Sequence, residues 1–171
     1  MIKKILFVLL SLLVFSAKSQ DSEELARRNG FKDIKLGSLI DSIKGAVFQK
    51  DFIELKEFEA KLYEIKDNPA YEKIGEASVK SVEMKVYKGL IYEIIVMTPK
   101  DPRIMQGLEK SYGHAKYSVR TETYSWHVKD KIGLTYKGLH KEIKLVYRCY
   151  PVIKMMYADK KKKIEEVADD F

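Results

Sequence analysis

The sequence predicts an α+β fold: an antiparallel sheet of about six strands with helices packed on one face. Three observations support this class. Apolar and polar residues alternate in several short runs, brief turns separate the runs, and a well-capped helix stands between two groups of them. A helix followed by three strands is expected twice, at about 31–98 and 99–150, which predicts a tandem pseudo-repeat. An amphipathic helix at about 153–168 is expected to come after the second repeat.

The first 19 residues have the pattern of a secretory signal peptide. Two lysines precede an apolar run from Ile5 to Phe15, and small residues come after the run. Ala17 and Ser19 supply the small side chains that a signal peptidase requires, so cleavage is expected between Ser19 and Gln20. The apolar run is shorter than the roughly 20 residues that span a bilayer, which disfavours the alternative of an uncleaved anchor.

Residues 20–171, beyond the predicted cleavage site, are expected to form a single domain. The chain has 171 residues, a hydrophobic fraction of 46% and one cysteine, which is typical of a folded protein without an intrachain disulfide framework. Cleavage would remove Lys3, Lys4 and Lys18 and so lower the formal net charge of +7 by three. The remaining charge does not require a nucleic-acid partner. The mature chain is expected in the periplasm or outside the cell, without a membrane-spanning segment.

The elements of the first half are predicted by local patterns. Residues 21–28 place acids first and arginines last, which suits the dipole of a short helix. Ser38 as N-cap and Gly45 as terminator predict a second short helix over 38–45. Residues 46–98 are expected to form strands, and the clearest hairpin joins 82–86 to 90–97 through a Lys-Gly turn.

The elements of the second half begin with the best-marked helix. Asp101 can cap it, Pro102 suits its first turn, and Gly113 ends it. Three strands are expected next, at 117–128, 132–136 and 143–149, with Pro151 closing the last.

The segment from Phe31 to Ile43, with its apolar-x-x-Gly-Ser pattern around Gly37 and Ser38, resembles the opening of small exported helix–β-meander domains. These include the SmpA/OmlA type of outer-membrane assembly protein and the β-lactamase-inhibitor-protein type. The Ser-Gln ending of the leader resembles signal peptides of Bacteroidetes-type bacteria. The resemblance implies an envelope or secreted protein that works by binding, and it brings no catalytic residues.

Motifs for metal, cofactor or nucleophilic chemistry are not found. His114, His127 and His140 lack the spacing of metal ligands, and no phosphate-binding or dinucleotide-binding glycine loop is present. No metal, cofactor or catalytic residue is therefore predicted. Cys149 lies in an alternating strand, where a small buried hydrophobe is a more common role than a nucleophile. The lysine run at 160–163 is flanked by acids and is interpreted as a solvated helix face.

Tyrosine is unusually abundant, with 11 in the chain. Tyr124, Trp126 and Tyr136 lie on adjacent predicted strands and could bind a sugar ring or a partner protein. The alternative is that these rings belong to the core, because they occupy its positions in the alternation.

These patterns leave three candidate functions. The first is a non-enzymatic exported protein that binds a protein or envelope partner through one face of its sheet. The second is a small-ligand or carbohydrate-binding module that uses Tyr124, Trp126 and Tyr136. The third is a hydrolase that uses Cys149 or two converging carboxylates. No pattern in the sequence indicates the oligomeric state.

Overall fold

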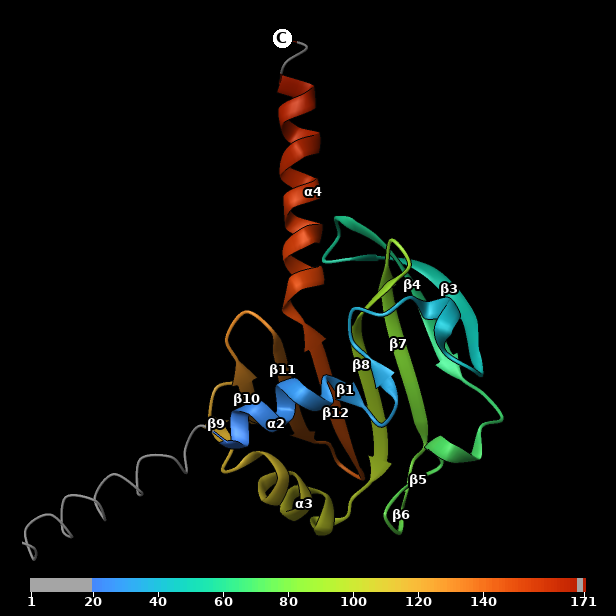
Figure 1. Cartoon of the computed structure of the whole chain (residues 1–171), viewed down its shortest axis with the longest axis vertical. Helices are drawn as coiled ribbons and strands as arrows, with labels where there is room; N and C mark the ends of the chain where they lie inside the picture. Colours follow the sequence, from blue (N-terminus) through green and yellow to red (C-terminus); the bar gives the residue numbers. More distant parts are fainter. Residues whose placement is uncertain (1–19, 169–170) are drawn as a thin grey trace, which may run out of the picture.

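The computed structural model describes residues 20–168 and Phe171 and confirms the α+β class. Within these residues, one large antiparallel sheet is accompanied by three helices: α2 (Gln20–Arg28), α3 (Pro102–Tyr112) and α4 (Tyr150–Ala168) (Figure 1). The predicted signal peptide, with Ser19, lies outside the described residues. Gln20 is the first residue of α2.

The sheet has eight strands rather than about six, in the order β3-β4-β7-β8-β12-β11-β10-β9. β8 and β12 pair at its centre, where Val96 lies opposite Leu145. Each half is therefore a meander of four strands, not three. The strand bounds are β3 (Ala46–Glu54), β4 (Phe58–Ile65), β7 (Ser81–Tyr87), β8 (Leu90–Pro99), β9 (Lys116–Ser118), β10 (Thr123–Val128), β11 (Ile132–Gly138) and β12 (Glu142–Cys149).

Turns within the expected strands account for the higher number. The chain at 117–128 is divided into β9 and β10 by a turn in which Glu122 has a φ of 52°. The chain at 46–65 is divided into β3 and β4 by Leu55 and Lys56, which also have positive φ. None of these three residues is a glycine, so the composition gives no turn signal there.

Short elements extend from the main sheet. Two-stranded ladders join β1 (Gly30–Phe31) to β2 (Ile34–Lys35) and β5 (Lys73–Ile74) to β6 (Ala77–Ser78). Single 3₁₀ turns form η1 (Ile40–Ser42) and η2 (Pro69–Tyr71).

The helix predicted over 38–45 is wrong: only the 3₁₀ turn η1 forms there. Its backbone groups are used by the beginning of β8 instead. The Ile40 N–H donates to the Gly89 carbonyl at 2.9 Å, and the Ile91 N–H donates to the Ser38 carbonyl at 3.0 Å. These hydrogen bonds to a distant segment of the same chain pair the backbone N–H and C=O groups that a helix would have paired internally.

The helix predicted after the Pro-rich linker is confirmed as α3. The Asp101 side chain accepts a hydrogen bond from the Arg103 N–H at 2.9 Å, and Pro102 occupies the first turn. Gly113, with a φ of 75°, ends the helix and donates to the Glu109 carbonyl at 2.9 Å. Each of these signals is local in sequence.

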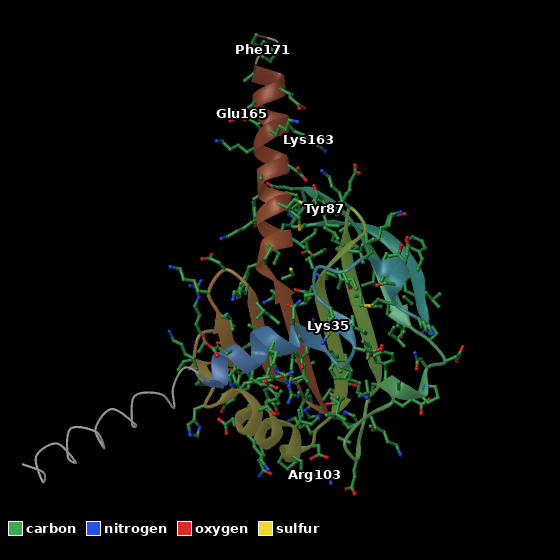
Figure 2. All side chains as sticks on the ribbon, viewed as in Figure 1. Lys35, Tyr87, Arg103, Lys163, Glu165 and Phe171 are labelled. Carbon is green, nitrogen blue, oxygen red and sulfur yellow. The ribbon has the colours of Figure 1, made fainter. Side chains whose placement is uncertain are left out.

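The C-terminal helix α4 is confirmed but begins at Tyr150, so Pro151 lies in its first turn rather than closing β12. A proline is tolerated there because a first-turn N–H has no intrahelical partner. Val152 and Met156 are buried, whereas the distal half projects beyond the sheet, with Lys163 and Glu165 along it (Figures 1 and 2). Among the described residues, no helix is both long enough and apolar enough to cross a membrane.

The core lies on the sheet face that α2 and α3 cover. Because side chains alternate along a strand, one set of buried side chains from β8, β11 and β12 points to this face: Ile94, Val96, Leu134, Leu145 and Tyr147. Leu25 of α2 is buried in the same core. The residues between them along each strand point to the opposite face, called here the open face.

Candidate functional site

A cavity of about 670 Å³ lies between the end of α2, the β5–β6 hairpin and α3, above β12. It is called here the helix–hairpin pocket. This volume is typical of small-ligand sites. Most of its lining is apolar and comes from β1, the hairpin, α3 and β12: Phe31, Ile74, Ala77, Ile104, Leu108, Leu145 and Tyr147.

The floor of the pocket belongs to the core. Leu145 and Tyr147 are two residues apart on β12, so the alternation directs both toward the helices. The Phe31 ring lies 6.2 Å from the Tyr147 ring and 6.5 Å from the Tyr71 ring. Burial raises the pKa of Tyr147, so its hydroxyl stays neutral at physiological pH and can donate a hydrogen bond.

One wall of the pocket is α3. Ile104 and Leu108 are four residues apart and share a face of this helix. Gly107 lies between them and also lines the pocket. A methyl group at Gly107 would meet no side chain of the described residues within 4 Å. A glycine in a helix interior costs roughly 1 kcal/mol relative to alanine, and here it leaves open space.

The opposite wall is the β5–β6 hairpin, which has an exposed ion pair on one side and hydrogen bonds to its backbone on the other. Glu76 pairs with Arg103 of α3 at 2.7 Å, and Arg103 also pairs with Asp101 at 2.7 Å. On the other side, the Lys32 ammonium donates to the carbonyls of Ala70 and Lys73. The hairpin therefore spans the pocket between α3 and the β1–β2 ladder.

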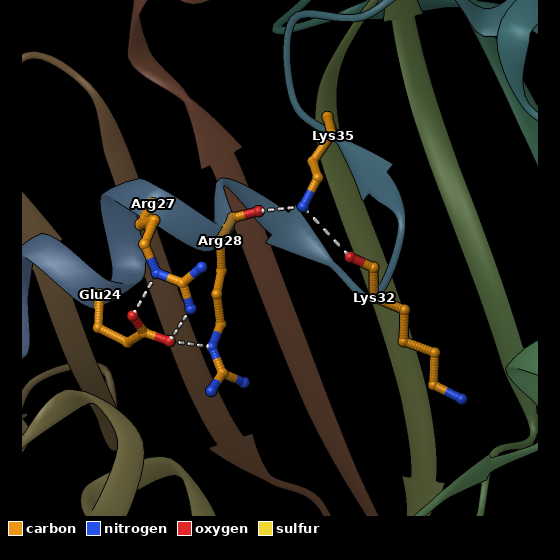
Figure 3. Close-up of polar contacts among 5 residues, drawn as sticks. All are labelled: Glu24, Arg27, Arg28, Lys32 and Lys35. Carbon is orange, nitrogen blue, oxygen red and sulfur yellow. Dashed lines mark hydrogen bonds and ion pairs between the residues drawn. The ribbon is translucent and has the colours of Figure 1, made fainter.

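The end of the pocket beside α2 is basic (Figure 3). Glu24 accepts hydrogen bonds from Arg27 Nε at 2.7 Å and from Arg28 Nε at 2.6 Å. These two contacts lower the pKa of Glu24 to about 2. The Arg28 guanidinium carbon lies 5.7 Å from the centre of the Tyr112 ring, and both residues line the pocket.

The tyrosines singled out from the sequence do come together, but outside this pocket. The rings of Tyr124 and Tyr136 are 6.0 Å apart, and Tyr117 extends the row at 4.7 Å from Tyr124. Trp126 is separate from this row because it is only 6% exposed and its Nε1 donates to the Gly113 carbonyl at 2.7 Å. The binding role of Tyr124, Trp126 and Tyr136 stays a prediction.

The open face of the sheet carries a cross-strand ion network. Lys85 Nζ contacts Glu54 at 2.6 Å and Glu93 at 3.2 Å. Arg148 Nε contacts Glu93 at 2.7 Å, and the Tyr92 hydroxyl donates to Glu54 at 2.7 Å. Glu93 is only 7% exposed, and its two oxygens face two different cations. Such pairing favours a structural role for these carboxylates.

The remaining sequence candidates are dispersed. Cys149 is buried, and burial raises the pKa of its thiol, which disfavours the reactive thiolate. His127 bonds to the Tyr150 hydroxyl at 2.7 Å, and burial lowers its pKa. Within residues 20–168, no group of three or more His, Cys, Asp or Glu side chains is arranged to hold a metal ion.

A second hollow of about 830 Å³ lies between the β3–β4 hairpin and the middle of α4. Its lining contains aromatic rings and also charged side chains of both signs. The charged side chains include Lys61, Glu59, Asp159 and Lys163. Asp159 is already held by Lys88 at 2.6 Å and by the Tyr87 hydroxyl at 3.0 Å. The helix–hairpin pocket is the more apolar of the two and is the candidate site.

The sequence patterns did not indicate this pocket. Its lining comes from segments far apart in the chain, and only Gly107, an interior glycine in a clear helix, carries a local signal. Comparison with known proteins found no match among protein-family models, curated proteins or solved structures.

Proposed function

We propose that this protein is an exported, non-enzymatic binding protein that holds a small apolar ligand in the helix–hairpin pocket. The observation that carries the proposal is a cavity with an apolar floor of Leu145 and Tyr147 and an open wall at Gly107, where no described side chain fills the space. Apolar cavities with a few polar groups at the rim are the usual form of small-ligand sites.

The charged side chains at the rim favour binding over catalysis. Arg103 is paired with two carboxylates, and Lys32 is bonded to backbone carbonyls. Groups held in this way position walls, whereas a general acid or base must reach a reacting atom.

The experiment that tests the proposal fills the pocket from α3. Gly107→Leu should lower the affinity for the neutral fluorophore N-phenyl-1-naphthylamine by about tenfold or more, because the leucine side chain takes the ligand's space. The free energy of unfolding of the Gly107→Leu protein should be equal to or higher than that of the parent, since leucine is a better helix residue than glycine. Fluorescence titration and urea unfolding measure the two quantities.

The matched control is Gly138→Leu. A methyl group at Gly138 also meets no described side chain within 4 Å, but this residue lies at the end of β11 and does not line the pocket. It should bind the fluorophore like the parent protein. Equal binding by the parent and Gly107→Leu proteins would contradict the proposal.

A second candidate function is the binding of a protein or envelope partner through the open face. Arg148 favours it, because its side chain is 46% exposed on that face while Glu93 holds its Nε in place, and a charge held in a fixed position gives specificity to a protein contact. Cross-linking in the native host tests this second candidate. The parent protein should form a stoichiometric adduct with its partner, and the reversed charge of Arg148→Glu should abolish the adduct. Lys154→Glu, a charge reversal on α4, is the control and should retain it.

The predicted tandem pseudo-repeat can be kept only in an altered form: each half holds a four-stranded meander, and the helix expected at 38–45 in the first half is replaced by the 3₁₀ turn η1. In this altered form α2, which precedes residue 31, takes the place of the missing helix, and the proposed ligand lies between α2 and α3.

A further inference from the structure

The charges around the helix–hairpin pocket are distributed unevenly. At the α2 end, one carboxylate, Glu24, serves two guanidinium groups, Arg27 and Arg28. At the opposite end, one guanidinium, Arg103, faces two carboxylates, Asp101 and Glu76. The first end therefore has an excess of positive charge, and the second has an excess of negative charge.

Lys35, beside the end of α2, increases this excess, because its ammonium group bonds to carbonyl groups rather than to a carboxylate. Lys35 Nζ donates to the Arg28 carbonyl at 2.7 Å and to the Lys32 carbonyl at 3.4 Å (Figure 3). The Lys32 ammonium lies at the hairpin instead, where it donates to the Lys73 carbonyl at 2.6 Å. The last carbonyls of a helix repel anions, and Lys35 offsets that repulsion beside Arg28.

Arg28 is the cation best placed to meet a ligand. It lines the pocket, and its Nε is directed at Glu24 while both Nη atoms point away from that carboxylate (Figure 3). The nearby Tyr112 ring supports the guanidinium plane. A fork of N–H groups held in one plane matches the two oxygens of a carboxylate.

We propose that the helix–hairpin pocket binds a single-chain carboxylate, with its alkyl chain on Leu145 and Tyr147 and its carboxylate on Arg28. This inference rests on the proposed function, because it requires that the pocket be occupied. The alkyl chain extends from Arg28 toward Ile104 and Ile74. The ligand takes this direction because the acidic end of the pocket would repel an anionic head group, whereas the excess positive charge near α2 attracts it.

The test compares ligands that differ only in the head group. Dodecanoate, dodecanol and dodecylamine compete with N-phenyl-1-naphthylamine for the full chain, each below its micelle-forming concentration. Dodecanoate should displace the fluorophore at a concentration about tenfold lower than dodecanol does, because a charge-assisted contact adds to the same apolar contact. Dodecylamine should be the weakest of the three.

Arg28→Gln identifies the head-group contact. It should remove the advantage of dodecanoate over dodecanol and leave the dodecanol value unchanged. Arg27→Gln is the matched control, because Arg27 shares Glu24 but does not line the pocket. The advantage should persist in that variant.

The outcomes separate the two proposals. If the fluorophore binds and Gly107→Leu blocks it, but the three head groups compete equally, the pocket binds apolar ligands and the carboxylate inference is overturned. If Arg27→Gln removes the advantage as fully as Arg28→Gln does, the assignment to Arg28 is overturned. If the fluorophore binds both glycine variants alike, the proposed function itself fails. The comparison in the parent protein decides the inference even if Arg28→Gln does not fold.

Discussion

Trp126 joins the end of α3 to the sheet. Its indole donates to the Gly113 carbonyl at 2.7 Å, and its ring lies 6.5 Å from that of Tyr112. Both rings are buried, so this contact fixes one wall of the helix–hairpin pocket in place. At the scale of single residues, the position of α3 thus depends on the Trp126 ring, for which the sequence also allowed a role in ligand or partner binding.

The first prediction concerns this ring. Trp126→Ala should lower the free energy of unfolding by about 3–5 kcal/mol, because it removes a large buried side chain. Trp126→Phe should cost about 1–3 kcal/mol, since the Gly113 carbonyl loses its donor. Urea unfolding measures both. Tyr117→Ala is the control, because Tyr117 is 47% exposed and should cost much less. Full stability of Trp126→Ala would show that the ring is not part of the core.

The two halves of α4 differ at the scale of elements. Val152 and Met156 pack into the core, and Lys160 reaches Glu57 at 2.7 Å. Beyond Lys163, the ion pairs made by Glu165 and Glu166 run to lysines of the same helix.

The second prediction is that deletion of residues 164–171 leaves the free energy of unfolding within about 0.5 kcal/mol of the parent value, because exposed helical pairs contribute little. Met156→Ala, in the buried half, should cost about 2–5 kcal/mol. Urea unfolding compares the two proteins. A large loss on deletion would mean that the distal half packs against the body.

Elements with local signals were predictable, and those set by distant contacts were not. α3 was predictable because Asp101, Pro102 and Gly113 determine its ends within the helix itself. The 38–45 segment has comparable local signals, but residues 89–91 take its hydrogen bonds. The pocket was not predictable for the same reason, because residues far apart in the sequence form its lining. Phe31 and Tyr147 meet only after the sheet forms, and alternation alone cannot state which helix will cover a given strand.

At the scale of the whole molecule, several carboxylates favour the ionised form on folding. Burial opposes ionisation of Glu54, but hydrogen bonds from Lys85 and Tyr92 outweigh it and hold its pKa below the ordinary value. Hydrogen bonds likewise lower the pKa of Asp101, beside Arg103, and the pKa of Asp159, beside Lys88 and Tyr87. Each group therefore contributes stability above its unfolded pKa, and that contribution is lost as the pH falls through the folded pKa.

The third prediction is that the free energy of unfolding falls slightly between about pH 7 and pH 5, because the unfolded chain protonates His127 more readily than the folded chain does, and falls more steeply below about pH 4.5 as the carboxylates titrate. Urea unfolding at a series of pH values measures this dependence. Glu54→Gln should flatten the acid limb, because one of the titrating groups is removed. An identical slope in the variant would mean that Glu54 does not contribute to it.

The division of the pocket between the two halves of the chain links ligand binding to folding. Residues 28–32 and 74–77 come from the first half, and residues 103–112, 145 and 147 come from the second. In the described part of the chain, the halves join in the sheet through the β8–β12 pairing alone, and neither half contributes the whole lining of the pocket. A bound ligand therefore stabilises the assembled chain by mass action and raises its unfolding midpoint with concentration. If the backbone were cut between β8 and α3, the same ligand would favour reassociation of the two fragments.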